Sequence, residues 1–184
     1  MKLNKKFWKN KKIFITIHTG FKGGWLSIIL NHLNCKISGY ALNPIGKKNF
    51  FYQVGLKNLL KNDLRNDICN ISNLRKSIKR IRPEIIFHLA AQSTVVESYK
   101  NPIQTILTNT LGTANLLQAS RDFSFIKCIV IVTTDKVYQN YKLIKKFDEN
   151  SKLGGDDIYS GSKASCEILV NSFKNSFFKE KNCK

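Results

Sequence analysis

Apolar segments of strand length alternate with segments of helical periodicity along most of this 184-residue chain. The strand-length segments are apolar throughout, without the alternation of a half-exposed strand, so both of their faces must be buried. This pattern predicts an α/β fold, a doubly wound parallel sheet covered by helices on both faces. We expect strands at residues 12–17, 35–42, 67–68, 84–91 and 125–134 and helices at residues 23–34, 71–81, 101–119 and 159–177.

Polar residues gather directly after these strands. Ligands of such sheets bind at the carboxyl ends of the strands, so this edge is where we expect a site. The polar residues found there are His18, Thr19, Asn43, Asp67, His88, Gln92 and the run from Thr133 to Lys136.

The formal net charge of +19 brings a nucleic-acid partner into consideration. Lysine supplies most of the charge, with 26 Lys against 5 Arg, whereas bidentate readout of bases or phosphates favours arginine. We therefore attribute the excess to an AT-biased coding sequence and to solvated faces, and expect no nucleic-acid partner. A nucleic-acid surface and the attraction of an anionic small molecule are the alternatives.

The five cysteines, at positions 35, 69, 128, 166 and 183, are odd in number and never spaced as CxxC. With only three histidines beside them, they predict neither a disulfide framework nor a metal site. The apolar run after the basic N-terminus is too short for a signal peptide, and no segment has the length of a membrane span. We expect a cytoplasmic protein without a membrane partner.

The stretch FITIHTGFKGGWL, residues 14–26, has the form of a strand, a glycine loop and the start of a helix. Gly20 and Gly23 would let the backbone approach a pyrophosphate, and the amides at the helix start would complete an anion site. Ile17 stands three residues before Gly20, where a first glycine is expected. The alternative is an ordinary glycine-containing turn.

Tyr159 and Lys163 are four residues apart in YSGSK, so on a helix they share a face. The lysine ammonium would then stabilise the phenolate, which makes the tyrosine useful as a general base. A tyrosine–lysine pair at this spacing is usually a pair of exposed residues without a catalytic role. Its position after Thr133-Thr134-Asp135-Lys136, in a chain that opens with a glycine loop, makes it more specific.

The segments HTGFKGGW, FHLAAQ, TTDKVYQN and YSGSK, in this order and spacing, resemble the extended short-chain dehydrogenase/reductases that act on nucleotide sugars. Within that group the sequence is most similar to the CDP-glucose 4,6-dehydratases, from Phe7 to Phe178. The resemblance implies a Rossmann-like sheet, NAD as the cofactor, and dehydration of CDP-glucose to CDP-4-keto-6-deoxyglucose for surface polysaccharide synthesis.

The resemblance also implies roles for five side chains. Tyr159 would be the base at the sugar 4-hydroxyl, and Lys163 would support it and hold the nicotinamide ribose. Thr134 would bond the 4-oxygen, and Asp135 would be the acid at the C6 hydroxyl. Lys136 stands where related enzymes carry a glutamate base, so its role is less defined, because a lysine base must be neutral.

For the cofactor, the resemblance implies contacts along the glycine loop and at the ends of the second to fourth strands. Asn43 stands where family members often carry an acid, but its amide could bond a ribose hydroxyl, so we expect NAD rather than NADP. Plain readings remain open: Asp67 as a turn residue, His88 as a core histidine, and Asn43 as a turn-former before proline. The implied cofactor residues are His18, Thr19, Gly20, Phe21, Lys22, Gly23, Asn43, Asp67, Ile68, Ala90, Ala91, Gln92, Tyr159 and Lys163.

The chain departs from the family in its first glycine, which is Ile17, and in lesser changes at Ile158 and Gly161. It also has about half the family's length, so we expect residues 1–184 to be an incomplete NAD-binding domain. The last strands of the sheet and the C-terminal region that grips the nucleotide-sugar would be missing. We expect either a lyase that needs a complementing C-terminal chain or a non-catalytic remnant. A nucleotide-sugar epimerase or reductase is the third alternative. A homo-oligomer of the chain is a further option.

Overall fold

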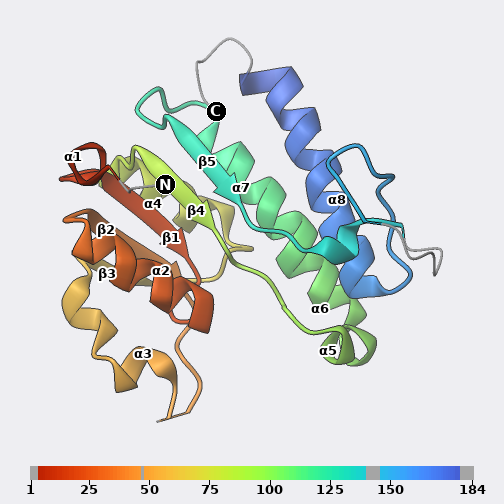
Figure 1. Cartoon of the computed structure of the whole chain (residues 1–184), viewed down its shortest axis with the longest axis horizontal. Helices are drawn as coiled ribbons and strands as arrows, with labels where there is room; N and C mark the ends of the chain where they lie inside the picture. The colour runs from red at the N-terminus through yellow and green to blue at the C-terminus, as the bar shows by residue number, and fades with distance from the viewer. Residues whose placement is uncertain (1–3, 47, 140–145, 179–184) are drawn as a thin grey trace.

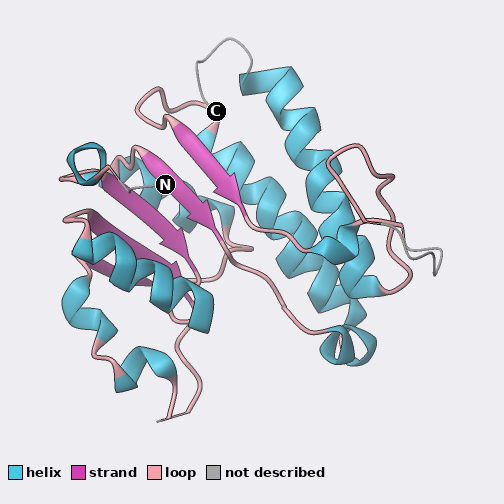
Figure 2. Ribbon diagram, in the orientation of Figure 1, coloured by secondary structure: helices cyan, strands magenta, loops and turns pink. Residues whose placement is uncertain are grey.

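The computed structural model describes residues 4–46, 48–139 and 146–178. Its centre is a five-stranded sheet in the order β3-β2-β1-β4-β5, with every neighbouring pair parallel (Figures 1 and 2). The order reverses direction between β1 and β4, where doubly wound sheets bind their ligands. The α/β fold expected from the sequence is confirmed. The strands are β1 Lys12–Thr16, β2 Lys36–Ala41, β3 Asn62–Arg65, β4 Ile85–His88 and β5 Cys128–Ile131.

Helices lie on both faces of this sheet (Figure 1). The twelve-residue α2, Phe21–His32, follows β1 directly, and the longest helix, α8, spans Ile158–Phe173. The other helices are α1 Lys5–Trp8, α3 Phe50–Gln53, α4 Ile71–Ile81, α5 Val95–Lys100, α6 Pro102–Ile106 and α7 Gly112–Ser120, and the short π and 3-10 segments are η1 Leu56–Leu59, η2 Leu107–Leu111, η3 Asp135–Val137 and η4 Lys174–Phe178.

The two faces of β1 build two separate apolar cores. Ile13 and Ile15 pack with Leu30 of α2, while Phe14 points the other way and packs with Leu74 of α4 and Leu116 of α7. Successive side chains of a strand point to opposite faces, which is why one apolar run supplies both cores. The continuous apolar character of residues 13–15 is therefore explained by burial on both sides.

One strand does not lie where the sequence placed it. The third strand was expected at residues 67–68, but the structure forms it at Asn62–Arg65 and puts Asp67 in the turn before α4. The true strand, NDLR, is polar because it lies at the edge of the sheet with half-buried side chains. A search for apolar runs could not find it.

No helix in the described ranges is long and apolar enough to cross a membrane. Cys35, Cys69, Cys128 and Cys166 are free thiols, and Cys183 lies outside the described residues.

A buried chain of polar contacts joins β1, β4 and α7. Thr16 lies 3.0 Å from His88 Nδ1, and His88 Nε2 lies 3.1 Å from Thr113 Oγ1. The Thr113 hydroxyl donates to the carbonyl of Asn109, and Thr16 Oγ1 accepts the backbone N–H groups of residues 89 and 90, so the ring must donate from Nε2 and accept at Nδ1. His88 is thus a neutral core histidine, and burial lowers its pKa to about 3.

We predict that this histidine makes the fold acid-sensitive. Between its unfolded pKa of about 6.5 and its folded pKa of about 3, the unfolded chain binds a proton that the folded chain does not. The free energy of unfolding should therefore fall as the pH drops from 7 to 5, with His88 alone contributing up to about 1.4 kcal/mol per pH unit. Urea titrations at pH 5, 6 and 7 measure this slope.

His88→Gln should flatten that slope, whereas the matched change His32→Gln, at an exposed position on α2, should leave it intact. An unchanged slope in His88→Gln would contradict the prediction.

Candidate active site

A cavity of about 390 Å³ opens at the carboxyl ends of β1, β4 and β5. The turn after β1 and the first residues of α2 form one wall, and α8 forms the opposite wall. The reversal of strand order leaves this space between the loops that leave β1 and β4 in opposite directions. It is lined by Ile17, Gly20, Phe21, Lys22, Gly23, Leu89, Ala91, Ser93, Val132, Thr133, Tyr159 and Lys163.

The turn from β1 into α2 keeps the shape of a glycine turn without its first glycine. Ile17 has φ +55°, a left-handed conformation that costs a β-branched residue roughly 1–3 kcal/mol. A Cβ on Gly23 would lie 2.2 Å from the Ile17 carbonyl oxygen, and one on Gly20 would lie 2.8 Å from the Ile17 side chain. Both glycines are therefore required for the approach of α2 to β1, and Ile17 occupies its position under strain.

His18 and Thr19, the next two residues of the turn, are buried and do not line the cavity. His18 lies against β2, where a Cβ on Gly39 would meet its ring at 2.3 Å. Its Nε2 lies 2.7 Å from Asp63 Oδ1 on β3. Burial lowers the pKa of His18, and Asp63 opposes that shift. The structure thus gives His18 a role in holding the turn onto the sheet.

Tyr159 and Lys163 face the cavity from the first turns of α8. Lys163 is 3% exposed, and its Nζ donates to the carbonyl of Val132 at 2.9 Å. Burial lowers the pKa of Lys163. One of its three N–H groups is thus fixed at the end of β5, and this fixes the ammonium beside the cavity.

Thr134, Asp135 and Lys136 follow β5 but do not line the cavity. Thr134 caps η3 and donates to Asp135 Oδ1 at 3.0 Å, and the side chains of Asp135 and Lys136 are exposed. Thr133, immediately before them, does line the cavity and donates to the Glu167 carboxylate on α8.

The residues expected at the adenosine end lie after β2 and β3. Asn43 is exposed. Asp67 is exposed and accepts the backbone N–H of Cys69 at 2.8 Å, so it does act as a turn residue. The Ile68 side chain is buried in the core beside Gly112. None of the three lines the cavity.

Of the residues expected after β4, Ala91 lines the cavity, whereas Ala90 is buried in the core. Gln92 is held by two side chains. Its backbone N–H donates to Asn109 Oδ1 at 2.7 Å, and its side-chain amide donates to the Thr105 hydroxyl at 2.9 Å. Asn109 also donates to Ser162 Oγ on α8 at 2.9 Å. This amide, which no motif indicated, positions α8 relative to the loop after β4.

Thr133 was expected at this edge of the sheet without a role, whereas three other cavity residues were not expected. They have no chemical group that would indicate a site, and only their places after β4 and β5 could have indicated them. These residues are Leu89, Ser93 and Val132.

The residues present fit a dinucleotide. Gly20 and Gly23 line the cavity and let α2 begin close against β1, the amides at the start of α2 supply anion contacts, and Lys163 adds a cation on the opposite wall. Lys22 adds a second cation beside the glycines. Ile17 is the single departure, because its side chain lines the space that the backbone of a glycine would leave open.

Comparisons with known proteins identify relatives of this chain. The profile of the GDP-mannose 4,6 dehydratase family matches residues 14–180. CDP-glucose 4,6-dehydratase of Salmonella typhimurium is 41% identical over 180 residues, which cover 98% of this chain and 50% of the Salmonella protein. The chain thus spans about half the length of the curated relatives it matches.

Solved structures share the fold at lower identity. Pal from Bacillus thuringiensis superposes with a TM-score of 0.79 at 23% identity, covering 90% of this chain and 52% of Pal. UDP-glucose 4-epimerase of Thermus thermophilus, solved in complex with NAD, gives a TM-score of 0.78 at 22% identity, covering 90% of this chain and 51% of the epimerase.

We predict that Ile17→Gly tightens NAD binding by about fivefold or more, because it opens the cradle and exposes the peptide between β1 and α2. The free energy of unfolding should change by less than about 1 kcal/mol, since relief of strain is offset by the extra freedom of glycine in the unfolded chain and by lost packing. Calorimetric titration with NAD and urea unfolding measure the two quantities.

Ile17→Ala is the matched control, because it removes the bulk of the side chain but keeps a Cβ at positive φ. It should recover only part of the gain. Equal or weaker binding in Ile17→Gly would show that Ile17 does not restrict the cradle.

Proposed function

The chain belongs to the GDP-mannose 4,6 dehydratase family, and we propose that it is the NAD-binding part of an enzyme that converts CDP-glucose to CDP-4-keto-6-deoxyglucose. The observation that carries the proposal is the cavity that brings the glycine turn of β1 and the Tyr159–Lys163 pair to one place. The similarity to a CDP-glucose 4,6-dehydratase along nearly the whole chain supports the substrate.

The cofactor would be held mainly through backbone groups. Gly20, Phe21, Lys22 and Gly23 would surround the pyrophosphate at the start of α2. Asn43, Asp67 and Ile68 would bind the adenosine end, and Ala90, Ala91 and Gln92 would lie beside the cofactor after β4. NAD, when bound, would accept hydride from C4 of the sugar and later return it to C6.

Tyr159 would take the proton of the sugar 4-hydroxyl. Lys163 supports this role because its ammonium lies on the same wall of the cavity, held by the Val132 carbonyl. The oxidised sugar carries a 4-keto group, to which the Thr134 hydroxyl would donate a hydrogen bond. Withdrawal of electrons by that keto group acidifies the C5 proton.

Water would then be lost across C5 and C6. A base removes the C5 proton, the C6–O bond breaks, and Asp135 supplies the proton that turns the departing hydroxyl into water. Lys136 stands at the position for the base and could act only in its neutral form. Asp135 and Lys136 lie together on η3, next to the cavity wall at Thr133.

Because the chain has about half the length of its relatives, its activity would depend on a further part that binds the sugar nucleotide. The described cavity offers the glycine turn and the catalytic helix, and relatives of twice the length carry a further half. We propose that a C-terminal half, in the same polypeptide or in a second one, grips CDP-glucose. We also propose that the protein forms a homo-oligomer and acts in the cytoplasm.

A non-catalytic NAD-binding module is the second candidate, and the strained Ile17 favours it. A nucleotide-sugar epimerase is the third candidate. Epimerases lack a pair like Asp135-Lys136, so this pair favours the dehydratase.

The dehydratase is tested by mixing the chain with NAD, CDP-glucose and the C-terminal half of the Salmonella relative. We expect a product lighter by one water in mass spectrometry, with the ultraviolet absorbance of a 4-keto-6-deoxy sugar in alkali. Tyr159→Phe should lower kcat by about 10²- to 10⁴-fold, since it removes the base.

Tyr52→Phe, the same change at an exposed position on α3, should leave the rate unchanged. Binding of NAD without any product from the mixture would reject the dehydratase in favour of the non-catalytic module.

A further inference from the structure

The first 62 residues of the chain contain no aspartate or glutamate; the first carboxylate is Asp63. This segment includes the turn after β1, all of α2 and β2, and the loop that follows β2. A doubly wound fold binds the pyrophosphate and the adenosine ribose of a dinucleotide along these elements. The loop after β2 at the adenosine end of the proposed site therefore carries no negative side chain. The carboxylate proposed at that end is Asp67, which follows β3 and accepts the backbone N–H of Cys69.

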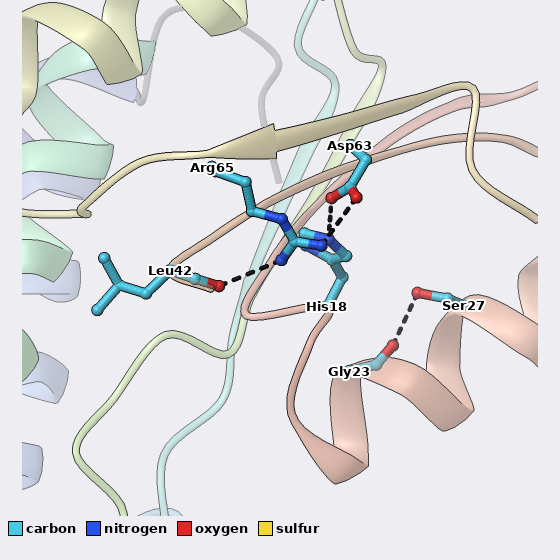
Figure 3. A network of polar contacts seen from close by, with 6 residues as sticks. All are labelled: His18, Gly23, Ser27, Leu42, Asp63 and Arg65. Atoms are coloured by element: carbon cyan, nitrogen blue, oxygen red, sulfur yellow. Dashed lines mark hydrogen bonds and ion pairs between the residues drawn. The ribbon is translucent and has the colours of Figure 1, made fainter. Parts of the chain in front are cut away.

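Asp63, the carboxylate nearest to this region in the chain, is already neutralised (Figure 3). His18 Nε2 lies 2.7 Å from its Oδ1, and Arg65 NH2 donates to its Oδ2 at 2.8 Å. The Asp63 side chain is only 15% exposed. Both of its oxygens thus already accept a hydrogen bond, and the Arg65 guanidinium balances its charge.

The guanidinium of Arg65 lies at the end of β2. Its Nη1 donates to the carbonyl of Leu42 at 3.2 Å (Figure 3). Its Cζ lies over the ring of Phe51, 4.7 Å from the centroid. Leu42 is the first residue after β2. The contacts described here use two of the five N–H donors of the guanidinium. Its charge is balanced by Asp63, but donor N–H groups remain next to the backbone that leads into Asn43.

Asn43 itself is exposed and uncharged. In sheets of this kind an acidic residue after the second strand bonds the ribose 2′-hydroxyl of NAD and repels a 2′-phosphate, whereas a nearby arginine accommodates the phosphate. This chain has an amide at the first position, and Arg65 bonds the carbonyl of the residue before it. An amide can donate to a phosphate oxygen as readily as it accepts from a hydroxyl.

We infer that the adenosine end of the site accepts a 2′-phosphate, with N–H groups of Arg65 donating to it, so that the chain binds NADP as well as NAD. The inference rests on the proposed dinucleotide site and adds a cofactor specificity to it. Ile17 does not affect the comparison, because both nucleotides carry the same pyrophosphate.

The test is calorimetric titration of the 184-residue chain with NAD and with NADP at one salt concentration. We expect the two Kd values to lie within about tenfold of each other, a difference of about 1.4 kcal/mol or less. Asn43→Asp restores the carboxylate and should weaken NADP relative to NAD by about tenfold or more, because it places a negative charge against the 2′-phosphate.

Asn58→Asp is the matched control: it makes the same charge change at an exposed position on η1 and should leave the ratio of Kd values unchanged. If the chain binds NAD but its Kd for NADP is more than about a hundredfold higher, the inference is overturned and the proposed function stands. A shift of the ratio by Asn58→Asp equal to that of Asn43→Asp would also overturn it, since the preference would then reflect overall charge. Binding of neither nucleotide would reject the proposed function and the inference with it.

Discussion

The cavity depends on how closely α2 approaches the end of β1. No side chain fits between the Gly23 backbone and the Ile17 carbonyl, and His18 is accommodated only because β2 carries Gly39 opposite it. With these approaches the helix starts directly beneath the carboxyl end of the strand, and its free amides face the cavity. Ile17 shows how strongly packing determines this turn, because the surrounding structure holds a β-branched residue at positive φ.

The opposite wall is positioned by polar contacts. Asn109, in the π-helical segment η2, bonds both the backbone of Gln92 and the hydroxyl of Ser162, and Lys163 reaches the end of β5. Thr133 adds a bond to Glu167. Because these contacts tie α8 to two loops of the sheet, the tyrosine face of α8 is oriented before any ligand arrives. Such preorganisation is what a proton-transfer site needs.

Much of this arrangement could be predicted from the sequence. The glycine turn and the tyrosine–lysine pair follow local rules, so Gly20, Gly23, Tyr159 and Lys163 were expected at the cavity that they line. The predicted position of the third strand was wrong, because the side chains of the true strand bond a neighbouring strand and carry no apolar pattern. The burial of His18 could not be predicted either, since its partner Asp63 lies 45 residues away in that same strand.

The two edges of the sheet differ in character. β3 ends one side with Asn62, Asp63 and Arg65, polar groups that discourage further pairing. β5, with the sequence CIVI, ends the other; within the described residues it pairs with β4 alone, and all four of its residues are partly exposed. An apolar edge strand with unpaired N–H and C=O groups readily pairs with a strand of another chain. A further strand that pairs with β5, in the same polypeptide or in a second one, would bury these backbone groups.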